Sequence, residues 1–243
     1  MLLCYPMVTI QENILRVREE IARVCQKIGR DPKEITLVGV TKFAPVEAIQ
    51  EAINTGVTDI AENKVQEGLK KYPGLQSPSG HGALKRHLIG HLQTNKVKDA
   101  LKIFDLIQSI DSLKLAQEVE KQALKLNRSI DILVQVNIAG EEQKFGADTQ
   151  GALNLISNIL KLKNVRILGL MTMAPFTEDQ KIVRDCFKGL QELRDQVVRD
   201  FKGNSNMEMK YLSMGMSGDF RIALEEGSNM IRVGSAIFRS THA

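Results

Sequence analysis

Short apolar, β-rich runs alternate with longer helical patterns along almost the whole chain of 243 residues. Eight such runs can be distinguished, at residues 35–40, 57–61, 86–90, 103–110, 131–138, 166–171, 210–214 and 230–234. Alternation of this kind is typical of βαβ units and a parallel sheet. Eight units predict an α/β fold closed into a (β/α)8 TIM barrel. An open doubly wound sheet stays the alternative from this pattern alone.

Helical spacing of apolar residues fills most of the segments between the runs. Residues 10–29 have this spacing and end at a glycine, so we expect an extra N-terminal helix before the barrel. Residues 72–85 are rich in Gly, Pro and Ser and predict a surface loop, either a plain insertion or a lid. A chain of this length can fold around one core, so we expect a single domain over 1–243. The other expected helices cover residues 46–55, 95–102, 113–126, 150–162 and 178–200.

Composition and charge restrict the partners. Lys and Arg number 33 against 29 Asp and Glu, and the interleaved signs leave a net charge of +4, which indicates no nucleic-acid surface. Aromatic residues make up 5% of the chain and Trp is absent, so base stacking is not expected either. No apolar run reaches the roughly 20 residues that a membrane helix needs, so we expect no membrane helix, and from the opening residues we expect no secretory signal. Three scattered cysteines suit a cytoplasmic protein, and without an obvious apolar face we expect a monomer.

Two small turns follow the seventh and eighth runs. They read SMGMSGD over 213–219 and GS over 234–235, and each precedes a helical segment. Loops after strands 7 and 8 of such barrels often bind phosphate. Glycine backbones, serine hydroxyls and helix N-termini all favour an anion. Either turn alone is more simply an N-cap or a tight turn, but their joint position predicts an anion site around Ser217 and Ser235.

Lys42 follows the first run and shares a strand face with Val38 and Val40, so its amine is expected at the barrel mouth. Most lysines are solvated surface charges. A lysine at a strand's carboxyl end, facing a phosphate site, is nevertheless what a Schiff base with a phosphorylated aldehyde requires. Both readings of Lys42 stay open at this point.

Other candidate motifs are weaker. His87 and His91 lie four residues apart in a run and its following turn, where helical metal-ligand spacing does not apply, so no metal site is expected. The sequence GMSGD lacks the spacing of a nucleophile elbow, and the glycine loops that bind nucleotides are absent.

Eight segments of the chain form a further pattern: VGVTKF (38–43), AENKVQE (61–67), HLIGHLQTNK (87–96), SIDSLKLA (109–116), LVQVNIAGEEQKFG (133–146), GLMTM (169–173), LSMGMSGDF (212–220) and EGSNMIRVGSAIF (226–238). In the same order, these segments resemble the YggS/PROSC family of pyridoxal phosphate homeostasis proteins. The resemblance covers about residues 10–238 and implies the barrel of the alanine racemase N-terminal domain, a fold type III binding site for pyridoxal 5'-phosphate (PLP). It also implies that PLP is held covalently on Lys42 as an internal aldimine.

The same resemblance implies roles for the pocket residues. Phosphate is expected at Ser217, Gly234 and Ser235, and Arg232 is expected near the pyridine nitrogen. A guanidinium cannot accept a proton, so it should leave that nitrogen unprotonated and make the ring a weaker electron sink. The remaining lining residues are expected to be Asn63, His87, Met171 and Ser213. The chain departs from the family pattern at positions that affect the rim: Ala61, Lys64, Arg86, His91 and Ser235, where glycine, tyrosine, tryptophan, proline and threonine are usual.

The implied function is control of free and bound vitamin B6 and, indirectly, of amino-acid balance, without catalysis and with apo-enzymes that use PLP as potential partners. Two alternatives stay open. A racemase-like PLP enzyme is one, although such racemases add a β-rich domain with a second base and the eighth run here ends close to the last residue. A barrel enzyme acting on a phosphorylated metabolite without PLP is the other, and it leaves Lys42 without a special role.

Overall fold

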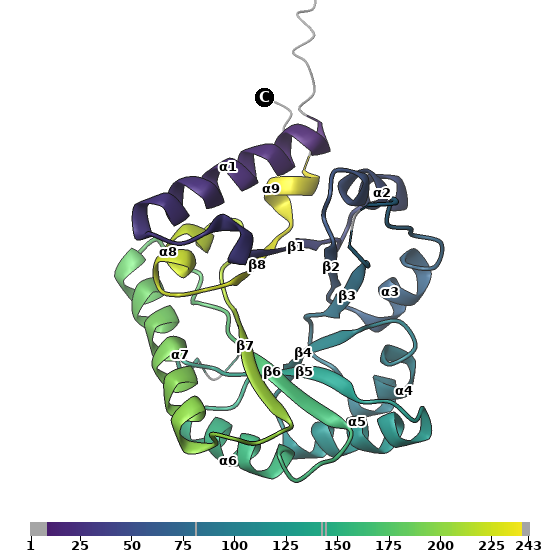
Figure 1. The fold of residues 1–243 in the computed structure, drawn as a ribbon, viewed down its shortest axis with the longest axis vertical. Coiled ribbons are helices and arrows are strands. Elements are labelled where there is room, and N and C mark those ends of the chain that lie inside the picture. Colours follow the sequence, from purple (N-terminus) through teal and green to yellow (C-terminus); the bar gives the residue numbers. More distant parts are fainter. Residues whose placement is uncertain (1–8, 81, 142, 144, 240–243) are drawn as a thin grey trace, which may run out of the picture.

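Eight parallel strands close into one barrel in the computed structural model, which describes residues 9–80, 82–141, 143 and 145–239. The strands follow one another around the barrel in chain order (Figure 1). Pairing of β1 with β8, in which Leu37 lies opposite Ile231, completes the ring. The α/β TIM barrel is therefore confirmed and the open sheet is excluded. The strands are β1 (Thr36–Val40), β2 (Asp59–Glu62), β3 (Lys85–Leu88), β4 (Leu106–Ile110), β5 (Ile130–Gln135), β6 (Val165–Met171), β7 (Met207–Ser213) and β8 (Met230–Val233).

Helices cover the outside of the barrel (Figure 1). Most bounds agree with the expected ones to within a few residues. The helices that follow the strands are α2 (Val46–Asn54), α3 (Val65–Lys71), α4 (Val97–Ala100), α5 (Leu113–Lys125), α6 (Thr149–Ile159), α7 (Gln180–Asp200), α8 (Phe220–Glu225) and α9 (Ser235–Phe238), and two short 3-10 turns are η1 (Pro32–Glu34) and η2 (Thr94–Lys96).

Two expected elements differ from the structure around Phe104. The helix expected over 95–102 is reduced to η2 and the single turn of α4. The run expected to begin a strand at residue 103 joins the sheet only at Leu106. Phe104 is buried and packs edge-on against the ring of Tyr72, while the Asp105 carboxylate accepts from the Arg86 backbone N–H. The Asp105 backbone N–H also donates to the Arg86 carbonyl at 2.7 Å, so the chain reaches β3 at Asp105 and pairs with it in register from Leu106.

The expected N-terminal helix is α1 (Ile10–Ile28), which lies against the short helices α8 and α9 (Figure 1). Thr9 begins it with a capping box: the Thr9 hydroxyl accepts from the Glu12 N–H, and the Glu12 carboxylate accepts from the Thr9 N–H. The buried Asn13 amide donates to the Ile237 carbonyl at 3.0 Å. Helix α1 is therefore tied to the helices that follow β7 and β8.

The segment expected as a surface loop, 72–85, is not wholly at the surface. Its first residue, Tyr72, is fully buried, and Leu75 is buried as well. Its last residue, Lys85, already belongs to β3. The expectation is wrong at these positions because Tyr72 contributes to the packing between α3 and the barrel. His81 lies outside the described residues.

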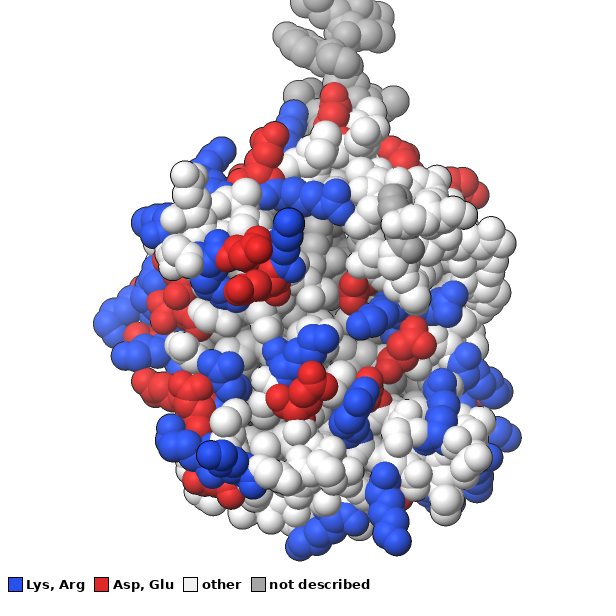
Figure 2. All heavy atoms as spheres, in the orientation of Figure 1, with Lys and Arg blue, Asp and Glu red and all other residues white. Residues whose placement is uncertain are grey.

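The interior of the barrel is mostly apolar, with Val38 and Val40 of β1 facing Ala61, Leu133, Met171 and Met230. A second, larger apolar layer lies between the strands and the helices. On the face displayed in Figure 2, basic and acidic side chains are intermixed, as their interleaving in the sequence predicts. Across the described ranges, no helix is both long and apolar enough to cross a membrane.

Candidate functional site

The two turns that were expected to bind an anion are in direct contact. After β7, the turn leads into α8, and after β8, Gly234 leads directly into α9. The backbone N–H of Ala236, in the first turn of α9, donates to Ser217 Oγ at 3.3 Å. The Arg232 N–H also donates to the Gly215 carbonyl at 2.9 Å. The structure thus brings Ser217, Gly234 and Ser235 into one small region at the carboxyl ends of β7 and β8.

Glycine at 215 is required by the shape of the first turn. Its φ is +97°, a conformation that side chains disfavour. A Cβ there would also lie 2.6 Å from the Cβ of Ala223. The turn can therefore fold tightly over α8 only with glycine at this position.

Gly234 places the anion turns beside the turn that carries Lys42. A Cβ on Gly234 would lie 3.2 Å from the carbonyl oxygen of Val40, the last residue of β1. Lys42 follows two residues later and is exposed. With Asn63, it lines an open cavity of about 400 Å³ between the ends of β1 and β2. Within the described part of the chain, Lys42 makes none of the hydrogen bonds or ion pairs that hold its neighbours.

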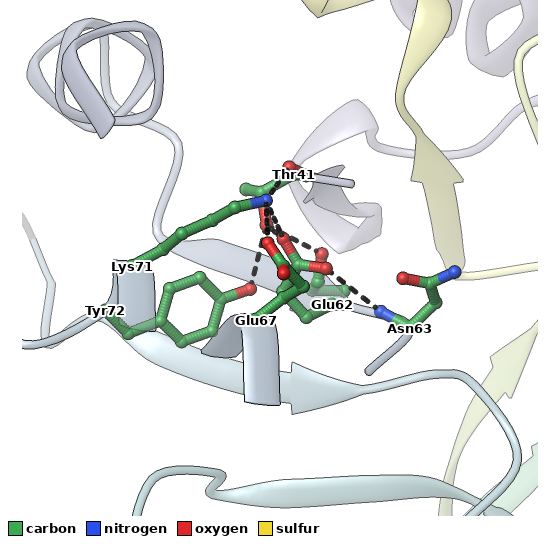
Figure 3. Close-up of polar contacts among 7 residues, drawn as sticks. Thr41, Glu62, Asn63, Glu67, Lys71 and Tyr72 are labelled. Atoms are coloured by element: carbon green, nitrogen blue, oxygen red, sulfur yellow. Dashed lines mark hydrogen bonds and ion pairs between the residues drawn. The ribbon is translucent and has the colours of Figure 1, made fainter. Parts of the chain in front are cut away.

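A buried polar cluster, here called the Glu62 cluster (Thr41, Glu62, Lys71 and Tyr72), holds the backbone on which Lys42 is carried (Figure 3). The Glu62 side chain is fully buried and lies 2.8 Å from Lys71 Nζ. Thr41 donates to Glu62 Oε1 at 2.8 Å and lies 3.0 Å from the Tyr72 hydroxyl. Lys71 Nζ also donates to the Thr41 carbonyl, which belongs to the peptide bond that precedes Lys42, at 3.2 Å.

Tyr72 is the member of the Glu62 cluster whose pKa is shifted by its surroundings. Burial raises the pKa of Tyr72 far above that of an ordinary tyrosine, and the nearby Glu62 carboxylate adds to the effect. Tyr72 is therefore a neutral hydrogen-bonding group at neutral pH. The Asn63 backbone N–H donates to the other Glu62 oxygen at 3.3 Å, so the cluster ties the turns after β1 and β2 together.

Arg232 is a buried cation inside the barrel, with only 3% of its surface exposed. Nη1 donates to Ser213 Oγ at 2.7 Å and Nη2 donates to the Thr172 carbonyl at 2.8 Å. A hydroxyl and a carbonyl are neutral, so neither partner offsets the charge of the guanidinium. Burial lowers the pKa of Arg232 to about 10, and the charge of Asp219 acts in the opposite direction. The guanidinium thus stays protonated at neutral pH, next to the turn that contains Asp219.

Asp219 lies in the turn after β7 and faces this cation. Burial raises the pKa of the Asp219 carboxyl, while the Met216 N–H, which donates to it at 2.5 Å, and the charge of Arg232 lower the pKa. The net direction is upward. An anion bound at this end of the barrel would add favourable charge beside the buried Arg232 guanidinium.

His87 and Met171 were expected to line the pocket, but both are fully buried and so do not form an open pocket wall. Met171 pairs in register with Ser213, at the ends of β6 and β7. His87 Nδ1 lies 2.8 Å from the Gln108 side-chain nitrogen, and Gln108 in turn contacts Ser213. The expected lining residues are thus brought together in one barrel, with His87 connected to Ser213 through Gln108.

Sequence reasoning missed Gln108, Thr41, Glu62, Lys71 and Tyr72. A usable signal existed for Gln108, because it is a polar residue in the middle of the apolar run that became β4. The same signal existed for Glu62 at the end of β2, whose four residues are all buried. Lys71 and Tyr72 gave no such signal, since a helix end and a loop start are ordinary places for polar residues.

Comparisons with known proteins agree with this fold and these segments. The family model for the N-terminal domain of alanine racemase matches residues 13–242. A pyridoxal phosphate homeostasis protein of Aquifex aeolicus (strain VF5) is 42% identical over 227 residues, which are 93% of this chain and 96% of that protein.

Solved structures give the same result. The structure of PipY from Synechococcus elongatus PCC7942 with PLP bound is 30% identical, with a TM-score of 0.81 over 95% of this chain and 100% of its own. An alanine racemase of Clostridium difficile 630 shares the fold, at 14% identity and a TM-score of 0.73 over 100% of this chain and 61% of the racemase. The chain belongs to the family of pyridoxal phosphate homeostasis proteins, which use the barrel of the alanine racemase N-terminal domain.

Proposed function

We propose that this protein binds PLP at the carboxyl ends of its barrel strands and takes part in cellular PLP homeostasis without catalysing turnover. Two similarities support the proposal: a relative with 42% identity has the name pyridoxal phosphate homeostasis protein, and PipY, with 30% identity, has been solved with PLP bound. The observation that carries it is the closure of the barrel. Closure sets the turn of Lys42 beside Gly234 and, through it, beside the turn of Ser217.

The residues at this end of the barrel fit the chemistry of the cofactor. Ser217, Gly234 and Ser235 offer hydroxyl and backbone donors for a phosphate, and Arg232 offers a buried positive charge with neutral partners. When bound, PLP supplies an aldehyde that condenses with a primary amine with loss of water. Lys42 is the residue we assign to this covalent attachment, with Asn63, His87, Met171 and Ser213 around the ring.

Arg232 favours storage of the cofactor over catalysis with it. Its guanidinium is a hydrogen-bond donor only and, with a pKa of about 10, it is protonated at neutral pH. A donor at the ring nitrogen prevents protonation there and so weakens the ring as an electron sink. This is the physical basis for a storage or carrier role, in which PLP-dependent apo-enzymes receive the cofactor from a monomeric, cytoplasmic protein.

The covalent assignment is tested by borohydride reduction after incubation with PLP. We expect the reduced wild-type protein to carry the mass of one cofactor on the peptide that contains Lys42. Lys42→Ala should lose this label but keep weaker, reversible binding, because the turns around Ser217 and Ser235 are unchanged. Lys98→Ala, at an exposed position on α4, is the matched control and should label as the wild type does. A label that persists in Lys42→Ala would place the anchor on another amine.

The same preparation tests the absence of catalysis. The loaded protein is incubated with L- and D-amino acids, and products are measured by chiral chromatography. We expect no sustained racemisation or decarboxylation. Turnover that is lost in Lys42→Ala and kept in Lys98→Ala would assign the racemase-like alternative instead.

A further inference from the structure

A chain of polar contacts crosses the barrel interior from β8 to β2, and all its side chains are buried. It begins where Arg232 Nη1 contacts Ser213 Oγ at 2.7 Å, and Ser213 Oγ lies 2.6 Å from Gln108 Oε1. Gln108 Nε2 lies 2.8 Å from His87 Nδ1. His87 Nε2 lies 3.2 Å from Asp59 Oδ1, an ion-pair distance that falls short of hydrogen-bond geometry.

The direction of every bond in this chain follows from its first member. A guanidinium donates and never accepts, so Ser213 Oγ accepts from Arg232. The single hydroxyl hydrogen of Ser213 is then directed to Gln108 Oε1. The amide nitrogen of Gln108 must therefore face His87, and its two hydrogens are directed to His87 Nδ1 and to Met230 Sδ, which lies 3.3 Å away.

His87 consequently accepts at Nδ1 and carries its hydrogen at Nε2, which faces Asp59. An ionised carboxylate suits that arrangement. Burial raises the pKa of Asp59. The contact with His87, the Thr58 hydroxyl and the charge of Lys85 together lower it by more, so the pKa lies below the ordinary value of an aspartate. Asp59 Oδ2 accepts from the Thr58 hydroxyl at 2.7 Å, so the carboxylate is itself held in place.

We propose that Gln108 is a positioning residue: by accepting from Ser213 it keeps the Ser213 oxygen in place to accept from Arg232, and by donating to His87 it keeps the His87 hydrogen on Nε2. The proposal rests on the proposed function, because the orientation of Arg232 matters for PLP. Within the described chain, these hydrogen bonds use one hydrogen of Nη1 and one of Nη2, so further guanidinium N–H groups remain for a ligand. The acceptor end of the Gln108 amide therefore holds Ser213 and, through it, Arg232, while the donor end sets the tautomer of His87.

The decisive variant is Gln108→Glu, which keeps the shape of the side chain but removes its donors. A carboxylate at this position still accepts from Ser213, but it can no longer donate to His87. His87 Nδ1 must then take up a proton in order to donate to the new carboxylate. Gln135→Glu is the matched control: Gln135 is a buried glutamine of β5 whose amide donates to the Phe145 carbonyl rather than to His87.

The first measurement is nitrogen NMR of the histidine rings in protein without PLP, so it does not depend on the proposed function. The chain has four histidines, and the His87 signal is identified by its loss in His87→Asn. We expect wild-type His87 and His87 in Gln135→Glu to be protonated at Nε2 alone, and His87 in Gln108→Glu to be protonated at Nδ1. Wild-type His87 with its hydrogen on Nδ1 would overturn the proposal, even if Gln108→Glu failed to fold.

The second measurement is PLP binding, followed by absorption as a function of pH. This measurement uses Gln108→Met, which removes the acceptor for the Ser213 hydroxyl and so releases the contact of Ser213 with Arg232. A reoriented guanidinium loses one charge-assisted hydrogen bond to the ligand, so we expect Gln108→Met to bind PLP about tenfold more weakly. The pH profile of the bound chromophore should shift as well, which a general loss of stability would not cause. Unchanged affinity and an unchanged profile would show that Gln108 does not position Arg232. Failure of the wild type to bind PLP would reject the proposed function, and the histidine tautomer would still decide the direction of the chain.

Discussion

At the scale of single residues, the Glu62 cluster combines a buried charge with a structural task. Glu62 has no exposed side-chain surface and Lys71 has 11%, so the pair is shielded from water and salt. Removing one partner of a buried ion pair leaves the other charge without compensation, which typically costs about 3–5 kcal/mol. We expect Lys71→Met to lower the free energy of unfolding by about this amount, measured by urea titration.

The double variant Glu62→Gln with Lys71→Met separates this explanation from a loss of packing. It removes both charges, so most of the stability should return. Lys181→Met is the control, because Lys181 pairs with Asp185 at the surface, where the side chains are 81% and 58% exposed. Its effect should stay below about 1 kcal/mol. Equal losses in Lys71→Met and Lys181→Met would contradict a dominant role for the buried charge.

At the scale of elements, the connection after β3 is packed directly on the connection after β2. The Ile89 N–H donates to the Glu62 carbonyl at 2.9 Å. A Cβ on Gly90 would lie only 2.0 Å from the carbonyl oxygen of Asn63, so the two backbones touch at this point. Gly90 is therefore required for close approach, and it sets the position of Asn63 at the rim of the cavity beside Lys42.

We expect Gly90→Ala to displace Asn63, to destabilise the protein by about 1–3 kcal/mol through overpacking and to weaken PLP binding. Gly82→Ala is the matched control, since a Cβ there meets only the Thr58 methyl group at 3.8 Å. Urea unfolding gives the stability and a PLP titration gives the affinity. If Gly90→Ala kept the affinity of Gly82→Ala, Asn63 would not belong to the binding site.

At the scale of the whole molecule, the proposed site exists only in the closed barrel, because it is assembled from turns after β1, β2, β7 and β8. A ligand that binds the folded state alone stabilises it by about 2.7 kcal/mol at a free concentration about 100 times Kd. For a protein of this size, that corresponds to a rise in Tm of roughly 5–10 °C.

Scanning calorimetry with PLP, with pyridoxal and with inorganic phosphate measures this linkage. PLP should raise Tm most, because it is the one compound that can engage both Lys42 and the anion turns. Equal shifts with inorganic phosphate alone would indicate a simple phosphate site. No shift with any of the three would contradict binding to the folded barrel.

Much of the architecture could be predicted from the periodicity of apolar residues and from the turn residues of the sequence. The eight apolar runs correspond to the eight strands, and helix α1 ends at Gly29 with φ +71°, a conformation that glycine adopts readily. The candidate residues Lys42, Ser217 and Ser235 were located by type and by position after a strand. Periodicity and turn chemistry are set by residues close together in the chain, so the sequence by itself determined the order and kind of the elements and the neighbourhood of the site.

Only the tertiary structure decided which distant residues meet. Ser213 and Gln108 are 105 residues apart, and Thr41 and Tyr72 are 31 apart, yet each pair is in hydrogen-bond contact. Whether Gln108 faces the interior depends on the register of β4 between β3 and β5, and whether Gly234 lies beside Val40 depends on the register in which β8 meets β1. Register is settled by the packing of all the strands together, so no single run of residues contains that information.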